Sequence, residues 1–472
     1  MYSKFTNMQR RKLTVDWSED RGELDLRRHS LGIGGINSAP PPKAVVDATA
    51  ALKPRMVRIF LQEFFFIYPE HGVFDWAKMD AYMDAVHAMG GDIMASICIK
   101  PKPLYPAVDE NIYMPTDIKE WQEVIRALVL RYSKEKPYVT YWSVANEMNI
   151  GEMGGCPYLI TNPDEFFEYY KFTIAPILEE LPDIKIGGPS AAAGCNNEMW
   201  DDGAIAFLER FVELCVTNKV RLDFICWNAY SDNPPSHADK GKIIRDNTDK
   251  YDPSIEIYMT ELNVLICNDA TLHEMAYEPK RAASLAATIL AFNENENLTG
   301  SFQYHIYDQW HNPKEFASWY ARTRFMSDCW NDMPHRFGLI DLDGRKRPQY
   351  YMYQLLYKTT GQRVGLEGID ETLTGLACCD EGTLSIFLTN FNIEETPDSI
   401  AHIHFANAPE GVYRLNMYRI DEESAMLIKN TNMDVLEPEE SRVVYVHPDF
   451  HFDIYTPGDS VTLVQLVKEE MK

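Results

Sequence analysis

The 472-residue chain lacks the long apolar runs of a membrane protein and the basic surplus of a nucleic-acid-binding protein. No run of 18 or more apolar residues occurs, so we predict no membrane-spanning helix. Lysine and arginine together number 45 against 71 aspartates and glutamates, which gives a formal net charge of −26. Nucleic acids and anionic membranes are bound through basic faces, so we expect neither as a partner.

Cysteine is scattered and forms no CxxC pair among its nine occurrences. Several cysteines, such as Cys98 and Cys226, lie in apolar strand-like runs, and we interpret them as reduced core thiols. The N-terminal stretch MYSKFTNMQRRKLTVDW contains no apolar core of a signal peptide. The sequence as it stands therefore predicts a cytoplasmic protein, whereas removal of a signal peptide would instead place it in the periplasm.

Motifs of several common chemistries are also missing. No GxSxG elbow is present, and the stretches GIGG (32–35) and IGGP (186–189) lack the context of a phosphate-binding loop. His305, Asp308 and His311 have a loosely metal-like spacing, but no further ligand reinforces them. We therefore predict neither a cofactor nor a metal.

From about residue 31 to residue 355, short β-prone runs alternate with longer amphipathic helical patterns. The candidate strands are LGIGGI (31–36), MVRIFLQ (56–62), DIMASICI (92–99), YVTYWSVA (138–145), IKIGGP (184–189), LDFICWNAY (222–230), IEIYMT (255–260) and SFQYHIY (301–307). Apolar strands separated by helices indicate a parallel sheet covered by helices. Eight such units fit a closed (β/α)8 TIM barrel, expected over residues 25–358, better than an open doubly wound sheet.

The pattern changes after about residue 360. Segments such as TLSIFLTNF and SRVVYVHP alternate apolar and polar residues with period two, and no convincing helix lies between them. We predict a C-terminal antiparallel β-sandwich domain over residues 359–472. The N-terminal segment 1–24 has no place in the barrel, and its stretch RKLTVDW is a candidate for one further strand of the sandwich.

Two of the predicted barrel strands end on carboxylates. The fourth strand is followed by Asn146 and Glu147, and the seventh by Glu261. The active site of a TIM barrel lies at the C-terminal ends of its strands, and these two strands stand on roughly opposite sides. One such carboxylate alone is often a helix cap or a loop salt bridge. Two that face each other, one as acid and one as base or nucleophile, are what glycosidic bond cleavage requires.

The segments around these residues resemble glycoside hydrolase family 39, a family of (β/α)8 glycosidases that retain anomeric configuration. RYSKEKPYVTYWSVANEMN (131–149) is similar to the family's acid/base segment, and DFICWNAY (223–230) and YMTELN (258–263) match further segments in order. The resemblance implies that Glu147 is the general acid/base and that Glu261 is the nucleophile of a covalent intermediate.

The resemblance also implies roles for three neighbours of the carboxylates. Asn146 would hydrogen-bond the 2-hydroxyl of the sugar, Tyr230 would hold Glu261, and Arg58 would lie beneath Glu261. A nearby Arg58 favours an ionised Glu261, whereas Glu147 has to carry a proton in order to act as an acid.

The chain departs from the family at positions that bear on the substrate. Ala145 and Met148 flank the Asn-Glu pair where the family has an aromatic residue and a proline. The sixth strand ends in Asn228-Ala-Tyr230 rather than His-x-Tyr, so Asn228 stands where a sugar contact is usual. A β-xylosidase is therefore only the default assignment.

The segment after the predicted eighth strand, residues 308–336, is rich in aromatic residues. They are Trp310, Phe316, Trp319, Tyr320, Phe325 and Trp330. Such rings either stack on sugars or pack the loop onto the barrel. Trp310, nearest the strand end, is the best candidate for a sugar contact, and His305 is a second. Lys100 and Lys102 are candidates for a sugar carboxylate, although solvated lysines are the commoner case.

The sequence thus predicts a retaining, exo-acting glycoside hydrolase that cleaves neutral oligosaccharides and is β-xylosidase-like. The alternatives are an α-L-arabinosidase or a uronic-acid glycosidase on the same scaffold, or a non-catalytic carbohydrate-binding protein. No patch in the sequence predicts a particular oligomeric state.

Overall fold

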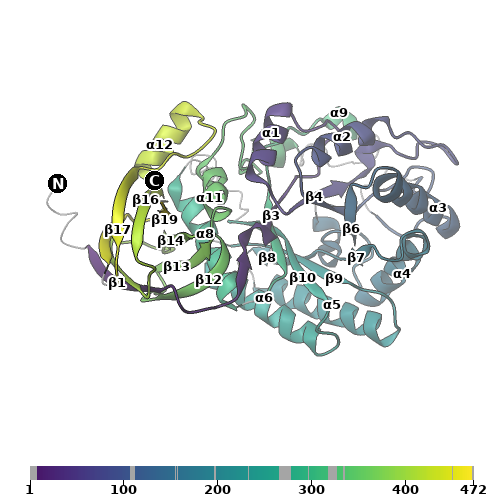
Figure 1. Ribbon diagram of the computed structural model, residues 1–472. Coiled ribbons are helices and arrows are strands. Elements are labelled where there is room, and N and C mark those ends of the chain that lie inside the picture. Colours follow the sequence, from purple (N-terminus) through teal and green to yellow (C-terminus); the bar gives the residue numbers. More distant parts are fainter. Residues whose placement is uncertain are drawn as a thin grey trace.

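The computed structural model describes residues 8–106, 112–154, 156, 158–195, 198–231, 233–264, 278–295, 297–316, 327–332, 335–448 and 450–469. Two units lie side by side, a barrel with its surrounding helices and a strongly curled sheet (Figure 1).

Parallel strands close into the barrel predicted from the sequence. They are β3 (His29–Gly32), β4 (Met56–Leu61), β5 (Asp92–Ile97), β6 (Val139–Val144), β7 (Lys185–Gly187), β9 (Phe224–Tyr230), β10 (Glu256–Asn263) and β11 (Gly300–Tyr304). Each pairs with the next in this order, and β11 pairs with β3, which closes the ring. The fold class is therefore confirmed for the described part of the chain.

A helix follows each of these strands and covers the outside of the barrel (Figure 1). These helices are α1 (Lys43–Leu52), α2 (Ala77–His87), α3 (Ile118–Val129), α4 (Pro163–Glu180), α5 (Glu198–Thr217), α6 (Pro234–Asp249), α8 (Pro279–Asn295) and α11 (Pro348–Leu356). In α3 the Asp117 side chain caps the first turn, and Trp121, Val124, Ile125 and Leu128 form a buried stripe at helical spacing.

The fifth strand position is interrupted. After β7, the chain turns at residues 188–190 and resumes as β8 (Ala191–Cys195), which also pairs with β9. Gly188 has φ +132°, and a Cβ there would lie 2.4 Å from the Val144 carbonyl oxygen. The glycines of the IGGP stretch thus serve close packing between strands rather than phosphate binding.

One layer of the barrel interior is filled by large side chains from β4, β5, β9, β10 and β11. Met56, Met94, Phe224, Tyr258 and Phe302 form one buried cluster there. Such a layer makes the barrel interior a packed core rather than a pore. Arg58 comes two residues after Met56 on β4, so its side chain also faces inward, one layer nearer to the C-terminal ends of the strands.

The second unit is a curled, mostly antiparallel sheet, consistent with the predicted sandwich. Its strands are β1 (Gln9–Asp16), β2 (Glu23–Asp25), β12 (Thr360–Glu367), β13 (Leu373–Asp380), β14 (Thr383–Asn390), β15 (Ser399–Ala406), β16 (Gly411–Ile420), β17 (Glu440–Val446), β18 (His451–Thr456) and β19 (Ser460–Lys468). The N-terminal strand β1 lies between β12 and β15, antiparallel to the first and parallel to the second. Leu13, Ile386 and Phe405 share its buried core.

The expectation of no helix after residue 360 is wrong. Helix α12 (Glu422–Thr431) lies between β16 and β17. Its start is a capping box, in which the Asp421 side chain accepts from the Ser424 backbone and the Ser424 hydroxyl accepts from the Asp421 backbone.

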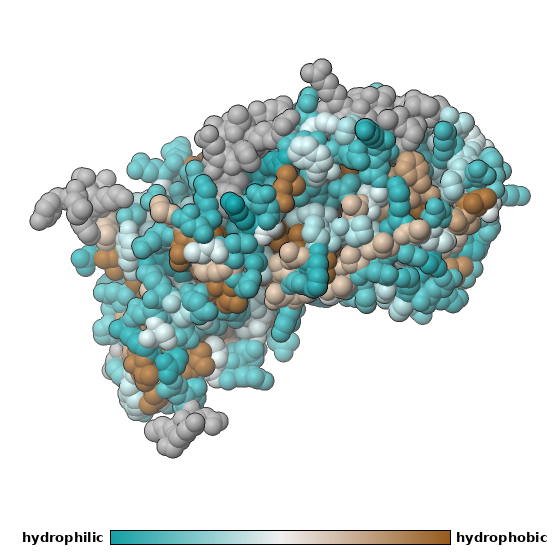
Figure 2. All heavy atoms as spheres, turned by 90° about the horizontal axis from the view of Figure 1, so that it is seen from above, coloured by the Kyte–Doolittle hydropathy of each residue, from teal (hydrophilic) through white to brown (hydrophobic). Residues whose placement is uncertain are grey.

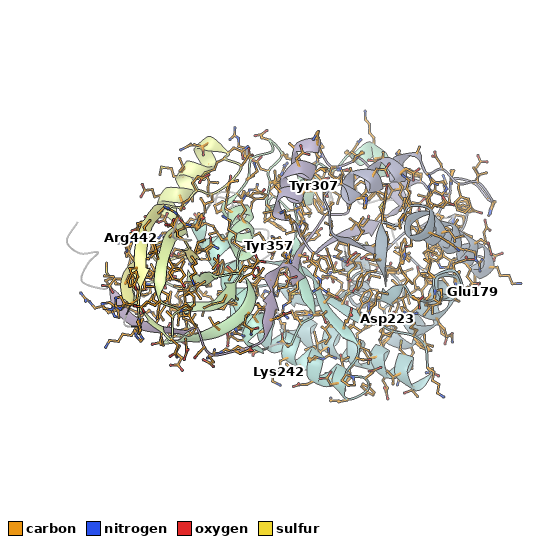
Figure 3. All side chains as sticks on the ribbon, in the orientation of Figure 1. Glu179, Asp223, Lys242, Tyr307, Tyr357 and Arg442 are labelled. Carbon is orange, nitrogen blue, oxygen red and sulfur yellow. The ribbon has the colours of Figure 1, made fainter. Side chains whose placement is uncertain are left out.

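Helices α8 and α11 join the two units. The Thr389 hydroxyl on β14 donates to the Ala283 carbonyl of α8 at 3.1 Å, and Lys280 of α8 donates to the Ile393 carbonyl at 3.1 Å. Gln354 of α11 donates to the Asp434 carbonyl, which precedes β17, at 2.9 Å. Tyr357 (Figure 3), where the chain leaves the barrel, donates to the His29 carbonyl of β3 at 2.6 Å. Polar residues dominate the face seen from above (Figure 2), and among the described helices none is long and apolar enough to cross a membrane.

Candidate active site

The backbone after β6 is held in a conformation that presents Glu147. Ala145 and Glu147 have φ of +71° and +53°, a left-handed conformation that costs a non-glycine residue roughly 1–3 kcal/mol. The Glu147 backbone N–H donates to the Ser190 carbonyl at 2.9 Å. Beyond it, the Asn149 side chain exchanges two hydrogen bonds with the Ala192 backbone, at 2.8 and 2.9 Å. The strained turn is thus fastened to the interrupted fifth strand.

A β-bulge places Glu261. On β10, Met259 is paired with Trp227 of β9 and Glu261 with Asn228, so Thr260 is an extra residue without a β9 partner. Neighbouring residues of a regular strand face opposite sides, and a bulge changes where they point. The Glu261 carboxylate is 5% exposed.

Arg58 connects the residues that follow β6 with the end of β10. Its Nη1 donates to Glu261 Oε1 at 2.9 Å and to the Thr260 carbonyl at 3.2 Å. Its Nη2 donates to Asn146 Oδ1 at 2.7 Å and to Ser190 Oγ at 3.3 Å. The guanidinium is fully buried, and a planar fork of this kind can hold two acceptors at fixed places.

Asn228 and Tyr230, from β9, complete the group. The Tyr230 hydroxyl donates to Glu261 Oε2, the oxygen that Arg58 leaves free. Asn228 Nδ2 lies 3.2 Å from both Asn146 Oδ1 and Glu147 Oε1. The structure therefore joins both carboxylates and four of the predicted binding residues, Arg58, Asn146, Asn228 and Tyr230, in one hydrogen-bonded group.

Burial and the neighbouring charges act on the pKa of Glu261 in opposite directions. Burial raises the pKa of Glu261 to about 7, and the negative charge of Glu147 adds to the rise. Arg58 and Tyr230 oppose it through their charge and hydrogen bonds. Burial, followed by the charge of Glu261, also raises the pKa of Tyr230 well above its usual value, so its hydroxyl keeps its proton and remains a donor.

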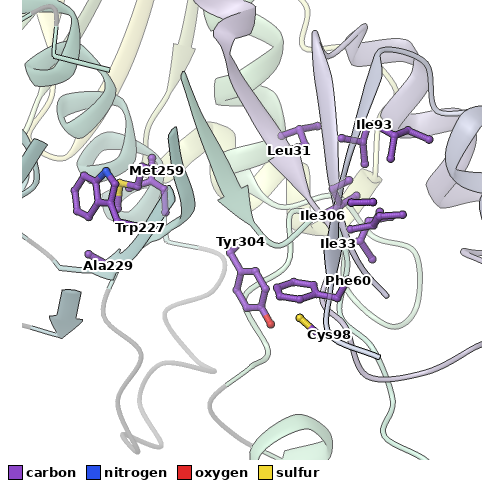
Figure 4. Close-up of a cluster of buried hydrophobic side chains, with 14 of the residues drawn as sticks. Leu31, Ile33, Phe60, Ile93, Cys98, Trp227, Ala229, Met259, Tyr304 and Ile306 are labelled. Carbon is purple, nitrogen blue, oxygen red and sulfur yellow. The ribbon is translucent and has the colours of Figure 1, made fainter. Parts of the chain in front are cut away.

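Tyr304, at the end of β11, is a site residue that the sequence analysis missed. Its ring packs edge-on against Phe60 and Tyr230, at centroid distances of 6.3 and 6.2 Å, and Cys98 lies beside Phe60 (Figure 4). Burial raises the pKa of Tyr304, and the charges of Glu261 and Glu147 raise it further. Its position, the last residue of the eighth strand, was a usable signal.

His305 and Trp310 take no part in the hydrogen bonds described above for this group. The His305 ring is fully buried, stacks on Trp330 at 5.4 Å, and has Nε2 3.2 Å from the His335 carbonyl oxygen. Burial lowers the pKa of His305 to about 4, so it is neutral and packs the loop. Trp310 is 56% exposed, and the Arg336 guanidinium lies 5.4 Å from its ring centre.

The rest of the aromatic loop is described in part. Trp319, Tyr320 and Phe325 lie outside the described residues, and Phe316 ends the short helix α9 (Pro313–Phe316). Trp330 is buried against Gly34, where a Cβ would lie 2.5 Å from its ring, and a Cβ at Gly35 would lie 2.6 Å from Phe60 Cβ, so close packing accounts for these two glycines of the GIGG stretch.

The metal-like spacing after the eighth strand has another explanation. Asp308 forms a buried ion pair with Arg347 at 2.7 Å. Across the described residues, no three His, Cys, Asp or Glu side chains are grouped in a way that could hold a metal ion.

Lys100 and Glu63 form a buried pair at the ends of β5 and β4. Each is 3% exposed, and the Lys100 backbone N–H donates to Glu63 Oε2 at 3.1 Å. Burial raises the pKa of Glu63 to about 8, opposed by this hydrogen bond and by the Lys100 charge.

Residues 55–430 match the model of the glycosyl hydrolases family 39. A β-xylosidase of Caldicellulosiruptor saccharolyticus is 22% identical over 382 residues, which are 75% of this chain and 71% of that protein. A monomeric β-xylosidase of Caulobacter crescentus superposes with a TM-score of 0.74 at 16% identity, covering 98% of this chain and 100% of the other. A bacterial orthologue of human α-L-iduronidase superposes with a TM-score of 0.71 at 15% identity, over 98% and 84%. The two superpositions show a shared fold.

Proposed function

This chain belongs to glycosyl hydrolase family 39 and is a glycosidase, and on that premise we propose that it is a retaining, exo-acting, β-xylosidase-like enzyme. The observation that carries the proposal is the hydrogen-bonded group that joins Glu147 and Glu261 through Arg58, Asn146 and Asn228. A carbohydrate-binding protein has no need of two carboxylates held in this way, and the burial of Glu261 would cost it stability.

In the first step, the Glu261 carboxylate attacks the anomeric carbon while the Glu147 carboxyl donates its proton to the departing glycosidic oxygen. The glycosidic bond breaks and a glycosyl ester forms on Glu261. In the second step, Glu147 takes a proton from water, whose oxygen displaces Glu261 and restores the original anomeric configuration. Asn146 donates through its Nδ2 to the 2-hydroxyl, because its Oδ1 already accepts from Arg58.

The preference for neutral sugars rests on the neighbouring charges. Arg58 is committed to Glu261 and Asn146. A sugar carboxylate would meet the ionised Glu261, the nucleophile of the first step, which disfavours a uronic-acid substrate. The two β-xylosidases named above make a terminal β-xylosyl unit the first substrate to test.

The test is hydrolysis of 4-nitrophenyl glycosides, with β-D-xyloside, α-L-arabinofuranoside and α-L-iduronide compared side by side. We expect β-xyloside to be hydrolysed fastest, and ¹H NMR to show β-xylose as the first product. Release of α-xylose would refute retention. Faster hydrolysis of the arabinofuranoside or the iduronide would reassign the sugar. Tight xylo-oligosaccharide binding without product would favour a binding protein.

A further inference from the structure

We propose that Thr260 and Ser190 are positioning residues, which fix the Asn228 amide so that its NH2 group, rather than its carbonyl, faces Glu147. This inference rests on the proposed acid/base role of Glu147. It assigns Asn228 to the acid/base residue rather than to the sugar, and it gives a role to two hydroxyl groups that the mechanism above does not use.

The contacts around Thr260 define which group donates. Its Oγ1 lies 2.8 Å from Asn228 Oδ1, and 3.2 Å from both Ser190 Oγ and the Trp227 carbonyl oxygen. A hydroxyl has one proton to donate, and the shortest contact is to Asn228 Oδ1. Ser190 Oγ accepts from Arg58 Nη2 at 3.3 Å, so the Ser190 proton is available to Thr260. Donation thus runs in one direction, from Arg58 through Ser190 and Thr260 to Asn228.

The contacts of the Asn228 NH2 group agree with this direction of donation. Asn146 Oδ1 has to accept, because Arg58 Nη2 donates to it at 2.7 Å. Asn228 Nδ2 lies 3.2 Å from that same oxygen and 3.2 Å from Glu147 Oε1. Rotating the Asn228 amide by 180° would bring two carbonyl oxygens together and remove the acceptor from Thr260. The hydrogen-bonding groups on both sides therefore select one orientation.

The bulge on β10 makes the arrangement possible. Because Thr260 is the extra residue of the bulge, its hydroxyl reaches Asn228 and Ser190 while the adjacent Glu261 still reaches Arg58. In a regular strand these two neighbours would face opposite sides of the sheet.

Other titratable groups also act on Glu147. Glu261 on β10, Tyr230 on β9, Tyr304 on β11 and the Cys156 thiol all interact with its charge. Arg58 on β4 is connected to it through Asn146. These groups are the same in the variants below, so any difference between those variants reports on Asn228 and its two hydroxyl neighbours.

The orientation has a consequence for the pH dependence of the reaction. An NH2 group that donates to Glu147 favours the ionised carboxylate, the form that acts as base in the second step. The protonated form, which acts as acid in the first step, is disfavoured. The alkaline limb of kcat/KM for a glycoside with a poor leaving group is therefore expected at a lower pH than without this hydrogen bond.

The experiment compares Thr260→Val with Thr260→Ser, and adds Asn228→Asp, on phenyl and 2,4-dinitrophenyl β-xylosides. Valine removes the donor that holds Asn228 Oδ1, so the amide is held on one side only and its hydrogen bond to Glu147 weakens. The alkaline limb is therefore expected to move up by about half a pH unit. Serine restores the donor and is expected to match the wild type. In Asn228→Asp a second carboxyl group faces Glu147, and the two groups can stay in contact only if they share a proton. The alkaline limb is therefore expected to move up by about one pH unit. The dinitrophenyl leaving group departs without needing a proton, so the pH profile of kcat/KM for this substrate is expected to lack the alkaline limb.

Two outcomes would overturn the inference. One is an alkaline limb that stays within about 0.1–0.2 pH units of the wild type, about the error of such a fit, in both Thr260→Val and Asn228→Asp. Thermal unfolding curves are used to check that both variants are folded. The other is a change in KM alone, equal for both leaving groups, which would make Asn228 a sugar contact. The variant Glu147→Gln distinguishes failure of this inference from failure of the proposed function. If Glu147→Gln still hydrolyses the phenyl glycoside at the wild-type rate, Glu147 is not the acid and the proposed function itself fails.

Discussion

Replacing Arg58 tests how much of the site depends on one buried guanidinium. Its two terminal nitrogens hold Glu261 Oε1 at 2.9 Å and Asn146 Oδ1 at 2.7 Å. A lysine ammonium in the same place has a single nitrogen and cannot occupy both positions. Losing one charged hydrogen bond costs about 1.5–3 kcal/mol, so Arg58→Lys is expected to lower kcat/KM by roughly 10- to 100-fold.

Arg58→Met goes further, because it removes the charge. Arg58 opposes the rise that burial and Glu147 cause in the pKa of Glu261, which is about 7 in the intact site. Without Arg58 this pKa rises further. The nucleophile has to be ionised, so the acid limb of kcat/KM is expected to move to higher pH. A carboxyl whose folded-state pKa is raised loses stability as the pH rises through that pKa, so the variant is expected to unfold more easily at pH 9 than at pH 5, by up to about 3–5 kcal/mol.

The assays are kcat/KM for an aryl glycoside from pH 5 to pH 9 and urea unfolding at both ends of that range. Arg58→Lys serves as the matched control, because it keeps the positive charge and is expected to shift the acid limb less than methionine does. An acid limb that stays at its wild-type position in Arg58→Met would refute the role assigned to this residue. Equal loss of stability at both pH values would also contradict it.

Three further perturbations test other parts of the site. In Glu147→Gln the negative charge that raises the pKa of Glu261 is gone, so with a 2,4-dinitrophenyl glycoside the acid limb is expected at lower pH; a move upward would contradict this. In Glu63→Gln the carboxyl whose folded-state pKa is about 8 is removed. The stability of the wild type relative to this variant should fall between about pH 4.5 and about pH 8, by as much as about 4 kcal/mol in urea unfolding, and a pH-independent difference would exclude the raised pKa. Trp310→Ala removes an exposed ring, so unfolding should change by less than about 0.5 kcal/mol while KM for xylotriose rises several-fold; an unchanged KM would remove Trp310 from the binding site.

Much of the barrel was predictable because its signal is local and repeated. Each buried strand is a short apolar run, and each helix carries a buried stripe at helical spacing, as Trp121 to Leu128 do in α3. Helix α12 was missed although its capping residues Asp421 and Ser424 are a local signal, since the strands around it suggested an unbroken sheet.

From the pattern of residues alone, site residues could be predicted only where they come at the C-terminal end of a predicted strand. Glu147, directly after β6, and Glu261, near the end of β10, were found by that position, whereas Arg58 and Tyr230 came from the family resemblance. Ser190 and Thr260 could not be found in this way. Their roles depend on an interruption of one strand and a bulge in another, and strict alternation along a strand predicts neither.

The most direct test of the two carboxylate roles is azide rescue of Glu261→Ala and Glu147→Ala with an aryl glycoside that the wild type hydrolyses. Without the nucleophile, azide attacks the anomeric carbon directly, so Glu261→Ala is expected to give a glycosyl azide of the opposite anomeric configuration. Without the acid/base residue, azide attacks the intermediate on Glu261, so Glu147→Ala is expected to give a glycosyl azide of the original configuration. A Glu261→Ala variant that hydrolyses at the wild-type rate, or that yields an azide of retained configuration, would contradict the assignment of Glu261 as the nucleophile.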